Sequence, residues 1–237
     1  KRVFLKGLTG LGLSTPLTFD HLNALISSIS HLSDNALATH EDFWLKIRTD
    51  YRLKSDYINL ENGFYCIMPK YIEDHYIEHV KEINFQGSYY MRTVQMENKK
   101  NSATRLAKMA GCLPEELIIT RNTIESLNLV IQGQKWEKGD EAIMAAQDYG
   151  AMRNQFRLME RRFGIAAREV SIPNHPKNDE EIVKLYESVI TRKTRLLMIC
   201  HMVNITGQIM PVQKICDMAH RYGARVMVDG AHAFGHI

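Results

Sequence analysis

The chain has 237 residues, enough for one large domain, or for one and a half smaller ones, with a substantial buried core. Hydrophobic residues make up 45% of the chain and charged residues 24%, as in ordinary soluble globular proteins. The formal net charge is only +3 and the basic residues are scattered, so we expect no nucleic-acid partner. No apolar run approaches the roughly 20 residues that span a bilayer, so we expect no membrane span.

The chain begins with a basic pair and a Gly- and Leu-rich stretch, KRVFLKGLTGLGLS. This stretch resembles a twin-arginine export signal, with Lys1 and Arg2 at the paired basic positions. The ALA tripeptide at 36–38 is a candidate cleavage site, which makes residues 1–40 an export signal and the protein periplasmic or exported. The alternative is an ordinary N-terminal helical leader on a cytoplasmic protein.

Residues 41–100 are predicted to form helices and irregular segments, partly of a small domain and on the substrate side. The pair Asn62 and Gly63 predicts a turn in this segment. Pro69 is typical of the beginning of a helix, because its fixed φ suits the first turn.

The helix after Pro69 contains HYIEH, an H-x-x-E-H pattern. It places His75 and His79 one helical turn apart with Glu78 beside them, as in inverted zinc metallopeptidases. This motif makes a zinc peptidase the alternative from another class of function, although no third ligand is identifiable in the sequence.

The four cysteines are far apart in the sequence and form no Cys-x-x-Cys pair. Zinc ligation and disulfide frameworks both use recognisable spacings, which are missing here. We therefore predict buried, reduced thiols and no metal centre built from them. The cysteines are Cys66, Cys112, Cys200 and Cys216.

Residues 101–237 are predicted to form a large domain of the α/β class. From about Glu115, short apolar runs alternate with helical patterns, one of which begins with Asn178 or Asp179 as its N-cap. This alternation predicts a mostly parallel sheet with helices on both faces, a three-layer αβα architecture. The five strand-like runs are ELIITR, EAIMAAQ, AAREVSI, TRLLMICHM and ARVMVD.

In such a sheet, ligands bind beyond the carboxyl ends of the strands. A helix N-terminus there offers free N–H groups and a positive dipole end, which suit a phosphate. We predict a flat, phosphorylated, nitrogen-containing ring that lies against Tyr149, with its phosphate at Thr123 and its nitrogen facing Asp229. The residues expected at this edge are Thr120 to Thr123, Asp148 and Tyr149, His201 to Asn204, and Asp229 to His232.

Five stretches, in the right order from about Tyr57 to the end, carry a resemblance to a known family. The chain resembles the class V aminotransferases, which are pyridoxal-phosphate enzymes of fold type I, and within them the isopenicillin N epimerase-like and cysteine desulfurase-like members. The resemblance implies pyridoxal 5'-phosphate as the cofactor. The matching stretches are YINLENGFYCIMP, ITRNTIESLNLVIQG, DYGAMRNQF, HMVNITGQIMPV and ARVMVDGAHAFGHI.

The resemblance assigns roles around the ring of the cofactor. Asp229 would pair with the pyridine nitrogen and keep it protonated, and His232 would lie beside the phenolic oxygen; both are candidate catalytic residues. Asn204 would lie near that oxygen or near the substrate carboxylate, and Tyr149 takes the stacking position. When the resemblance is set aside, an aspartate such as Asp229, at the end of a strand and before a glycine, is often only a turn residue.

The resemblance also assigns the phosphate and substrate sides. Asn122 and Thr123 begin the helix under the phosphate, although Thr123 also suits an ordinary N-cap. Ile124 departs from the family, which often has a hydroxyl residue there, so cofactor binding is weaker or backbone amides take over the task. Asn62 and Gly63 lie in a segment that approaches the substrate in relatives.

The family needs a lysine that bonds to the cofactor and moves protons at the alpha carbon of the substrate. In relatives this lysine follows the position of Asp229, whereas the last lysine here, Lys214, precedes it. We expect that the chain is part of a longer protein and ends before that lysine, the remaining strands and a C-terminal small domain. The reactive cysteine of a desulfurase also usually lies beyond this point. The alternative is a genuinely shortened, inactive gene product.

The stretches NTIESLNLVIQG and DYGAM, with Tyr149, favour the epimerase-like branch. We expect the complete protein to be an epimerase or an aminotransferase that acts on an amino acid or amine, and to form a homodimer. A C–S lyase like cysteine desulfurase or selenocysteine lyase is the nearest alternative. A non-catalytic protein of the same fold is another.

Overall fold

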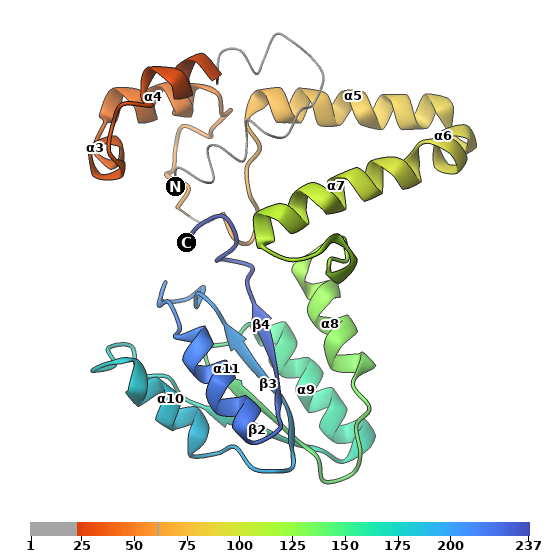
Figure 1. Cartoon of the computed structure of the whole chain (residues 1–237), viewed down its shortest axis with the longest axis vertical. Helices are drawn as coiled ribbons and strands as arrows, with labels where there is room; N and C mark the ends of the chain where they lie inside the picture. Colours follow the sequence, from red (N-terminus) through yellow and green to blue (C-terminus); the bar gives the residue numbers. More distant parts are fainter. Residues whose placement is uncertain (1–22, 61) are drawn as a thin grey trace. The chain divides into compact units, whose positions relative to one another are not determined.

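The computed structural model describes residues 23–60 and 62–237. The chain divides into two compact units, Lys1–Ile119 and Thr120–Ile237 (Figure 1). The basic pair and the Gly-rich stretch predicted to be an export signal lie outside the described residues. In the described part of the chain, no helix is long and apolar enough to cross a membrane.

The first unit is helical wherever it has regular structure among its described residues. The candidate cleavage site at 36–38 lies in a short helix, where Leu37 is buried in a cluster with Phe43. The helix predicted after Pro69 is present, with Pro69 at its N-cap. The helices are α3 (Asp34–Ala38), α4 (Glu41–Thr49), α5 (Lys70–Gln86), α6 (Ser88–Thr93), α7 (Gln95–Ala110) and the 3-10 turn η1 (Pro114–Glu116).

Helix α7 passes through residue 101, where the sequence places the start of the large domain. It ends at Gly111, which has a left-handed conformation with φ 72° that suits glycine. Residues 101–119 therefore group with the first unit, and the second unit begins at Thr120.

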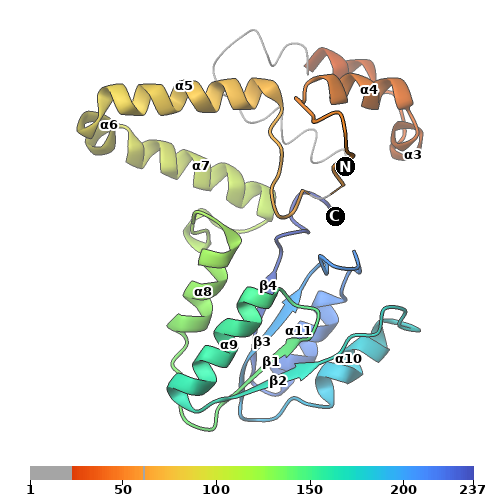
Figure 2. The same ribbon diagram turned by 180° about the vertical axis from the view of Figure 1, so that it is seen from behind.

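The second unit has the predicted three-layer αβα arrangement (Figures 1 and 2). Its sheet is parallel throughout, with the strand order β2-β1-β3-β4. Four helices cover the sheet, and α10 begins at the predicted N-cap Asn178, whose side chain accepts a hydrogen bond from the amide of Glu181. The elements are α8 (Thr123–Gly133), β1 (Glu141–Ala145), α9 (Gly150–Phe163), β2 (Ala166–Val170), α10 (Asp179–Glu187), β3 (Thr194–Cys200), α11 (Val212–Arg221) and β4 (Arg225–Asp229).

The prediction of a strand at 116–121 is wrong. Ile118 is 79% exposed and Ile119 is 50% exposed, and no strand is assigned to this run. Branched side chains favour a strand when they pack against neighbours on a sheet, and such packing is missing here. The sheet of the described residues therefore has four of the five predicted strands.

Buried side chains alternate between the two faces of the sheet. Ile143 and Leu197 pack in the core beneath α10 and α11, which lie in front of the sheet in Figure 1. Met144 and Met198 pack on the other face, beneath α8 and α9, which Figure 2 shows in front. Both faces of the central strands β1 and β3 are buried, as the continuous apolar runs predicted, whereas the outer strands β2 and β4 are partly exposed. The second core is rich in methionine, with Met144, Met152, Met159, Met198 and Met227.

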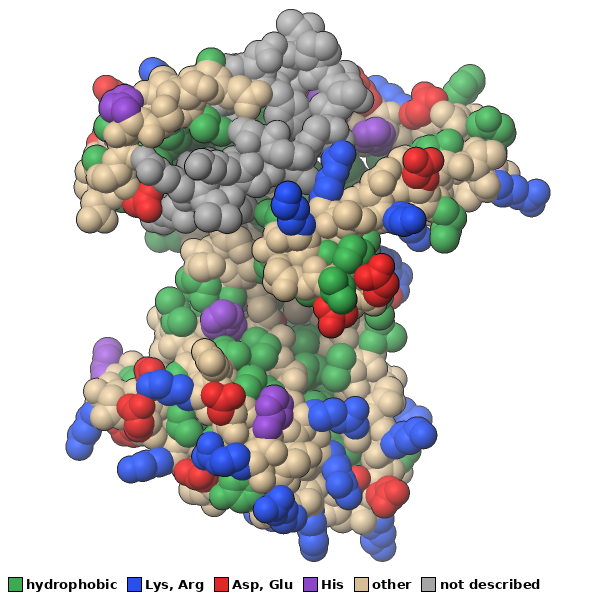
Figure 3. Space-filling model, in the orientation of Figure 1, with side chains coloured by type: hydrophobic (Ala, Val, Ile, Leu, Met, Phe, Trp, Pro, Cys, Tyr) green, Lys and Arg blue, Asp and Glu red, His purple; other side chains and the backbone are tan. Residues whose placement is uncertain are grey.

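Ion pairs mark the amino ends of the strands. Arg168 pairs with Glu141 at 2.6 Å, and Arg195 pairs with Asp140 at 2.8 Å. Figure 3 shows basic side chains gathered at this end of the second unit. The carboxyl ends of the strands, where the ligand is expected, lie at the opposite edge.

The cysteines are free thiols, as predicted, but they are not all buried. Cys200 is buried at the end of β3, and Cys112 and Cys216 are partly buried. Cys66 is exposed, so the prediction of burial is wrong for this residue. It lies in an irregular segment before α5, which buries few side chains.

Candidate functional site

The chain reverses its course across the sheet between β1 and β3. From β1 it moves to β2 on one side, and then returns so that β3 and β4 lie on the other side. A crevice outside the carboxyl ends of the strands forms at such a switch point and is where ligands bind in open α/β sheets. The residues that follow β1 and β3 are therefore the first to consider.

Asp148 ties these two strands together. It is 3% exposed, and its Oδ2 accepts a hydrogen bond of 2.8 Å from the amide of Ala145, the last residue of β1. Its Oδ1 accepts a longer bond of 3.3 Å from the amide of Cys200, the last residue of β3. The sequence predicted that Asp148 lies at this edge, but gave it no role.

Asp229, at the end of β4, lies beside the same cysteine. It is 6% exposed, and its Oδ1 accepts a hydrogen bond of 3.1 Å from the amide of Ala231. Its carbonyl oxygen accepts one of 2.9 Å from the amide of His201. Its Oδ2 lies 3.9 Å from the Sγ of Cys200, a weak contact that leaves this oxygen able to accept a stronger hydrogen bond.

The electrostatics of this cluster follow from its burial. Burial raises the pKa of Asp148 to about 6, and the nearby charge of Asp229 adds to the shift, although the amides of Ala145 and Cys200 oppose it. Burial and the two carboxylates also raise the pKa of the Cys200 thiol. The site therefore has one carboxylate, Asp148, whose pKa lies close to neutral pH, and one thiol, Cys200, that stays protonated at neutral pH.

Tyr149 follows Asp148 directly and is the N-cap residue of α9. Its ring is partly buried and packs against the methionine-rich core that contains Met152 and Phe156. Tyr149 is thus held at the carboxyl edge of the sheet by the start of a long helix. This is the edge at which the sequence predicted a stacking aromatic ring.

The start of α8 reaches the same edge. The helix has 11 residues and is about 16 Å long. Gln134, just after its last residue, forms a hydrogen bond with Arg225, the first residue of β4. From this contact, α8 extends toward the side of the sheet on which β4 ends, so its first residue, Thr123, lies on the side of the carboxyl edge (Figure 1).

The N-terminus of α8 offers groups that suit an anion. The side chain of Asn122 caps the helix by accepting a hydrogen bond of 2.9 Å from the amide of Glu125. Within the described residues, no hydrogen bond occupies the amides of Thr123 and Ile124. Arg121, which lies within the predicted range Thr120 to Thr123 but was given no role there, pairs with Glu125 at 3.1 Å beside these amides. Asn122 thus caps the helix, and its predicted contact with a phosphate stays a prediction.

The two remaining predicted ring contacts lie in loops at this edge. Asn204 is exposed, in the loop after β3 that a hydrogen bond of 2.9 Å from Val203 to Gln208 closes. His232 is partly buried in the turn after β4, where its carbonyl oxygen lies 2.8 Å from Nδ1 of His236. Both follow neighbouring strands, but their predicted contacts with a ring stay predictions.

The two predicted substrate-side residues belong to the first unit. Asn62 lies between α4 and α5, and its Oδ1 accepts a hydrogen bond of 3.1 Å from Asn59. Gly63 follows it in a bend, as the predicted turn requires. Their approach to a substrate stays a prediction.

The residues proposed for zinc lie on α5. Nδ1 of His75 is 3.4 Å from Oε2 of Glu78, and His79 follows on the same helix. Over residues 23–60 and 62–237, no group of three or more His, Cys, Asp or Glu side chains gathers to hold a metal ion. The structure therefore gives the zinc-peptidase alternative no support.

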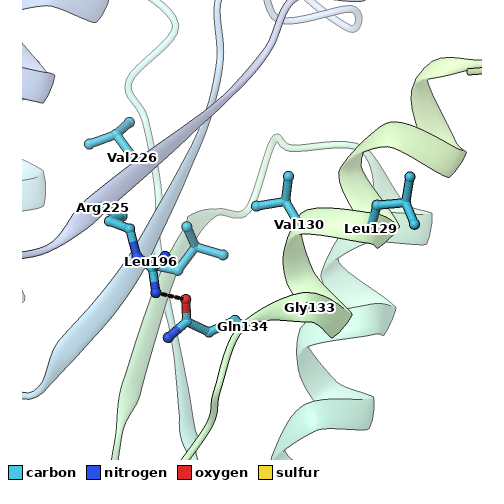
Figure 4. A pocket seen from close by; sticks show the side chains of 7 residues that line it. All are labelled: Leu129, Val130, Gly133, Gln134, Leu196, Arg225 and Val226. Carbon is cyan, nitrogen blue, oxygen red and sulfur yellow. Dashed lines mark hydrogen bonds between the residues drawn. The ribbon is translucent and has the colours of Figure 1, made fainter. Parts of the chain in front are cut away.

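A hollow of about 300 Å³ lies elsewhere, at the amino ends of β3 and β4 (Figure 4). Its single charged lining residue is Arg225, whose guanidinium is bonded to Gln134. None of the predicted site residues lines it. Its lining residues are Leu129, Val130, Gly133, Gln134, Leu196, Arg225 and Val226.

The sequence of residues 71–237 matches the model of a protein family described as aminotransferase class-V. The matched segment covers α5 to β4 and includes each residue of the cluster at the carboxyl edge. Members of this family are pyridoxal-phosphate-dependent enzymes.

Two curated relatives illustrate the similarity. Isopenicillin N epimerase of Streptomyces clavuligerus is 32% identical over 130 residues, which are 55% of this chain and 33% of that protein. Cysteine desulfurase of Shigella sonnei is 32% identical over 149 residues, which are 61% of this chain and 35% of that protein. The chain therefore spans about a third of the length of these relatives.

Solved structures share the fold. A cystine C–S lyase in complex with its product cysteine persulfide aligns with a TM-score of 0.64 and 22% identity. The alignment covers 72% of this chain and 46% of the lyase. This likeness supports the fold-type I architecture of the second unit.

Proposed function

Because the chain belongs to the class-V aminotransferase family, we propose that the protein binds pyridoxal 5'-phosphate at the carboxyl edge of its sheet. The proposed activity is that of an isopenicillin N epimerase-like epimerase or an aminotransferase, with an amino acid or amine as substrate. The observation that carries the proposal is the buried carboxylate of Asp229, which has one oxygen bonded to the chain and the other able to accept a hydrogen bond.

The chemistry of the donor groups fits this cofactor. A protonated pyridine nitrogen needs a carboxylate acceptor, which Asp229 provides. A phosphate needs free amides and a cation, which Thr123, Ile124 and Arg121 provide at the start of α8. A flat ring needs an aromatic face, for which Tyr149 is the candidate. Backbone amides thus take over the task of the hydroxyl that the family often has at Ile124.

Bound at this edge, the cofactor would supply an acceptor for the electrons of the bond that breaks at the alpha carbon of the substrate. Asp229 would hold a proton on the ring nitrogen, and its burial would strengthen this interaction because little water screens it. Tyr149 would offer its aromatic face to the ring. We assign His232 to the phenolic oxygen and Asn204 to that oxygen or to the substrate carboxylate, from adjacent loops.

The experiment that tests the proposal is a cofactor titration. We expect the purified protein to bind pyridoxal 5'-phosphate with a change in visible absorbance and to contain no stoichiometric zinc in elemental analysis. Asp229→Asn should bind the cofactor more weakly, and Asp217→Asn, which changes an exposed carboxylate on α11, is its matched control and should bind the cofactor normally. A protein that stays colourless in excess cofactor contradicts the proposal, and one that holds zinc instead favours the peptidase.

We propose further that the protein is a homodimer. Helix α5 has no buried residue in the described structure and exposes Ile77, Val80 and Phe85, an apolar surface that a second copy would cover. We expect light scattering to give twice the mass of one chain, and Phe85→Asp to lower it toward that of a monomer. Lys81→Asp on the same helix is the control. A monomeric mass for the unaltered protein contradicts this proposal.

A further inference from the structure

We infer that Asp148 is a positioning residue for Asp229, that it acts through Cys200, which contacts both acids, and that its charge sets how strongly the site attracts a protonated ring nitrogen. This inference rests on the proposed cofactor. It adds Asp148, a carboxylate that would not touch the ring, to Asp229, the carboxylate proposed to bind the ring nitrogen.

The connection between the two acids is built from the ends of three adjacent strands. Asp148 follows β1, Cys200 ends β3 and Asp229 ends β4. The Asp148 carboxylate accepts the amide of Cys200 at 3.3 Å, and the thiol of the same residue lies 3.9 Å from Oδ2 of Asp229. Cys200 is therefore held from one side by Asp148 and contacts Asp229 on the other.

Cys200 gives a different group to each of the two acids. Its backbone amide donates to Asp148 at 3.3 Å, and its thiol lies 3.9 Å from Oδ2 of Asp229. Because the thiol contact is long, Oδ2 of Asp229 can accept a stronger hydrogen bond from another donor. A charge on Asp148, on the other side of Cys200, makes the surroundings of that oxygen more negative.

Two backbone amides, those of Ala145 and Cys200, offset the charge of Asp148 in part, but none of the titratable groups that act on it is a cation. The titratable groups that act on it are Cys200 from β3, Asp229 from β4 and Tyr186 from α10. Each is neutral or negative at neutral pH, because burial raises the pKa of both the thiol and the phenol. The hydroxyl of Tyr186 is buried without a hydrogen bond among the described residues, so it gives Asp148 no donor.

A buried pair of acids that has no cation beside it favours the binding of a cation. A protonated ring nitrogen at Oδ2 of Asp229 brings a positive charge to this place. The charge on Asp148 therefore strengthens cofactor binding, and by linkage the bound cofactor favours loss of the Asp148 proton. Since burial places the pKa of Asp148 at about 6, the strengthening should develop as the pH rises through this value.

The test compares cofactor affinity, measured by absorbance or fluorescence titration, at about pH 5 and about pH 8. We expect the unaltered protein and Asp148→Asn to differ little at the lower pH, and the unaltered protein to bind about five-fold or more tightly at the higher pH. At each pH, the affinity of the unaltered protein is divided by that of Asp148→Asn. This ratio removes the effect of the cofactor's own titration, because that effect is the same for both proteins. A purely structural role of Asp148 would change the affinity equally at both pH values.

A second pair of variants tests the thiol and does not depend on the folding of Asp148→Asn. We expect Cys200→Ala, which removes the donor beside Oδ2 of Asp229, to keep or raise cofactor affinity, and Cys200→Ser, whose hydroxyl is a stronger donor to that oxygen, to lower it several-fold. Cys216→Ala, which removes a partly buried thiol from α11, is the matched control and should have no effect.

The outcomes separate this inference from the proposed function. If the unaltered protein binds no cofactor at either pH, the proposed function fails. If it binds, but the affinity ratio is the same at both pH values, the proposed function stands and the role of Asp148 is refuted. Equal affinities of Cys200→Ala and Cys200→Ser likewise refute the role of the thiol.

Discussion

Replacing Asp229 by alanine is expected to lower the turnover of the protein about a hundred- to a thousand-fold. The carboxylate keeps a positive charge on the ring nitrogen, and removal of one buried, preorganised electrostatic partner typically costs a factor of this size. Because Asp229 acts throughout the reaction, we expect kcat to fall more than the affinity for the amino acid or amine. Steady-state kinetics with saturating cofactor measures both.

The controls for this prediction address folding. Asp229→Ala also removes the acceptor of the Ala231 amide, so its unfolding curve must be compared with that of the unaltered protein. Asp217→Ala removes an exposed carboxylate from α11 and should keep full turnover. Normal turnover of a well-folded Asp229→Ala protein would remove the proposed mechanism.

The cofactor-free protein should lose stability as the pH rises from about 4 to about 7, through Asp148. The folded-state pKa of about 6 lies above the ordinary value of 3.8, so between these values the folded protein keeps a proton that the unfolded chain releases. The free energy of unfolding therefore falls with rising pH. A difference of about two pH units corresponds to about 3 kcal/mol in total.

Urea unfolding at several pH values, compared with Asp148→Asn, isolates this contribution. We expect the difference in unfolding free energy between the two proteins to follow the predicted fall. Other carboxylates act in the opposite direction: burial raises the pKa of Glu141, but hydrogen bonds from Thr191 and Arg168 outweigh it and lower the pKa. Their contribution is common to both proteins and cancels. A difference that does not change with pH contradicts the prediction.

The sheet was predictable because its central strands, β1 and β3, are short apolar runs and all four strands alternate with helical patterns. The run at 116–121 has the same composition, yet it forms no strand, since pairing depends on a neighbour that local sequence does not specify. The helix start at Asn178 was predictable for the opposite reason: capping is a local interaction, here with Glu181.

The candidate site was predictable in position but not in detail. The order of strands and helices is enough to bring Tyr149 and Asp229 to one edge of a parallel sheet. The contact between Cys200 and Asp229 depends on residues 29 positions apart, on strands whose neighbourhood the sequence does not specify. For this reason the sequence predicted only that Cys200 is a buried, reduced thiol.

The methionines beneath α8 and α9 give the protein a chemical vulnerability that depends on motion. Met144, Met152 and Met198 are fully shielded in the folded state, where an oxidant has no access to their sulfur atoms. A transient opening of this layer would expose several of them together, and each sulfoxide would bring a polar group into the core. A brief, reversible fluctuation would thus become lasting damage, so the lifetime of the protein under peroxide reports how often this side of the sheet opens.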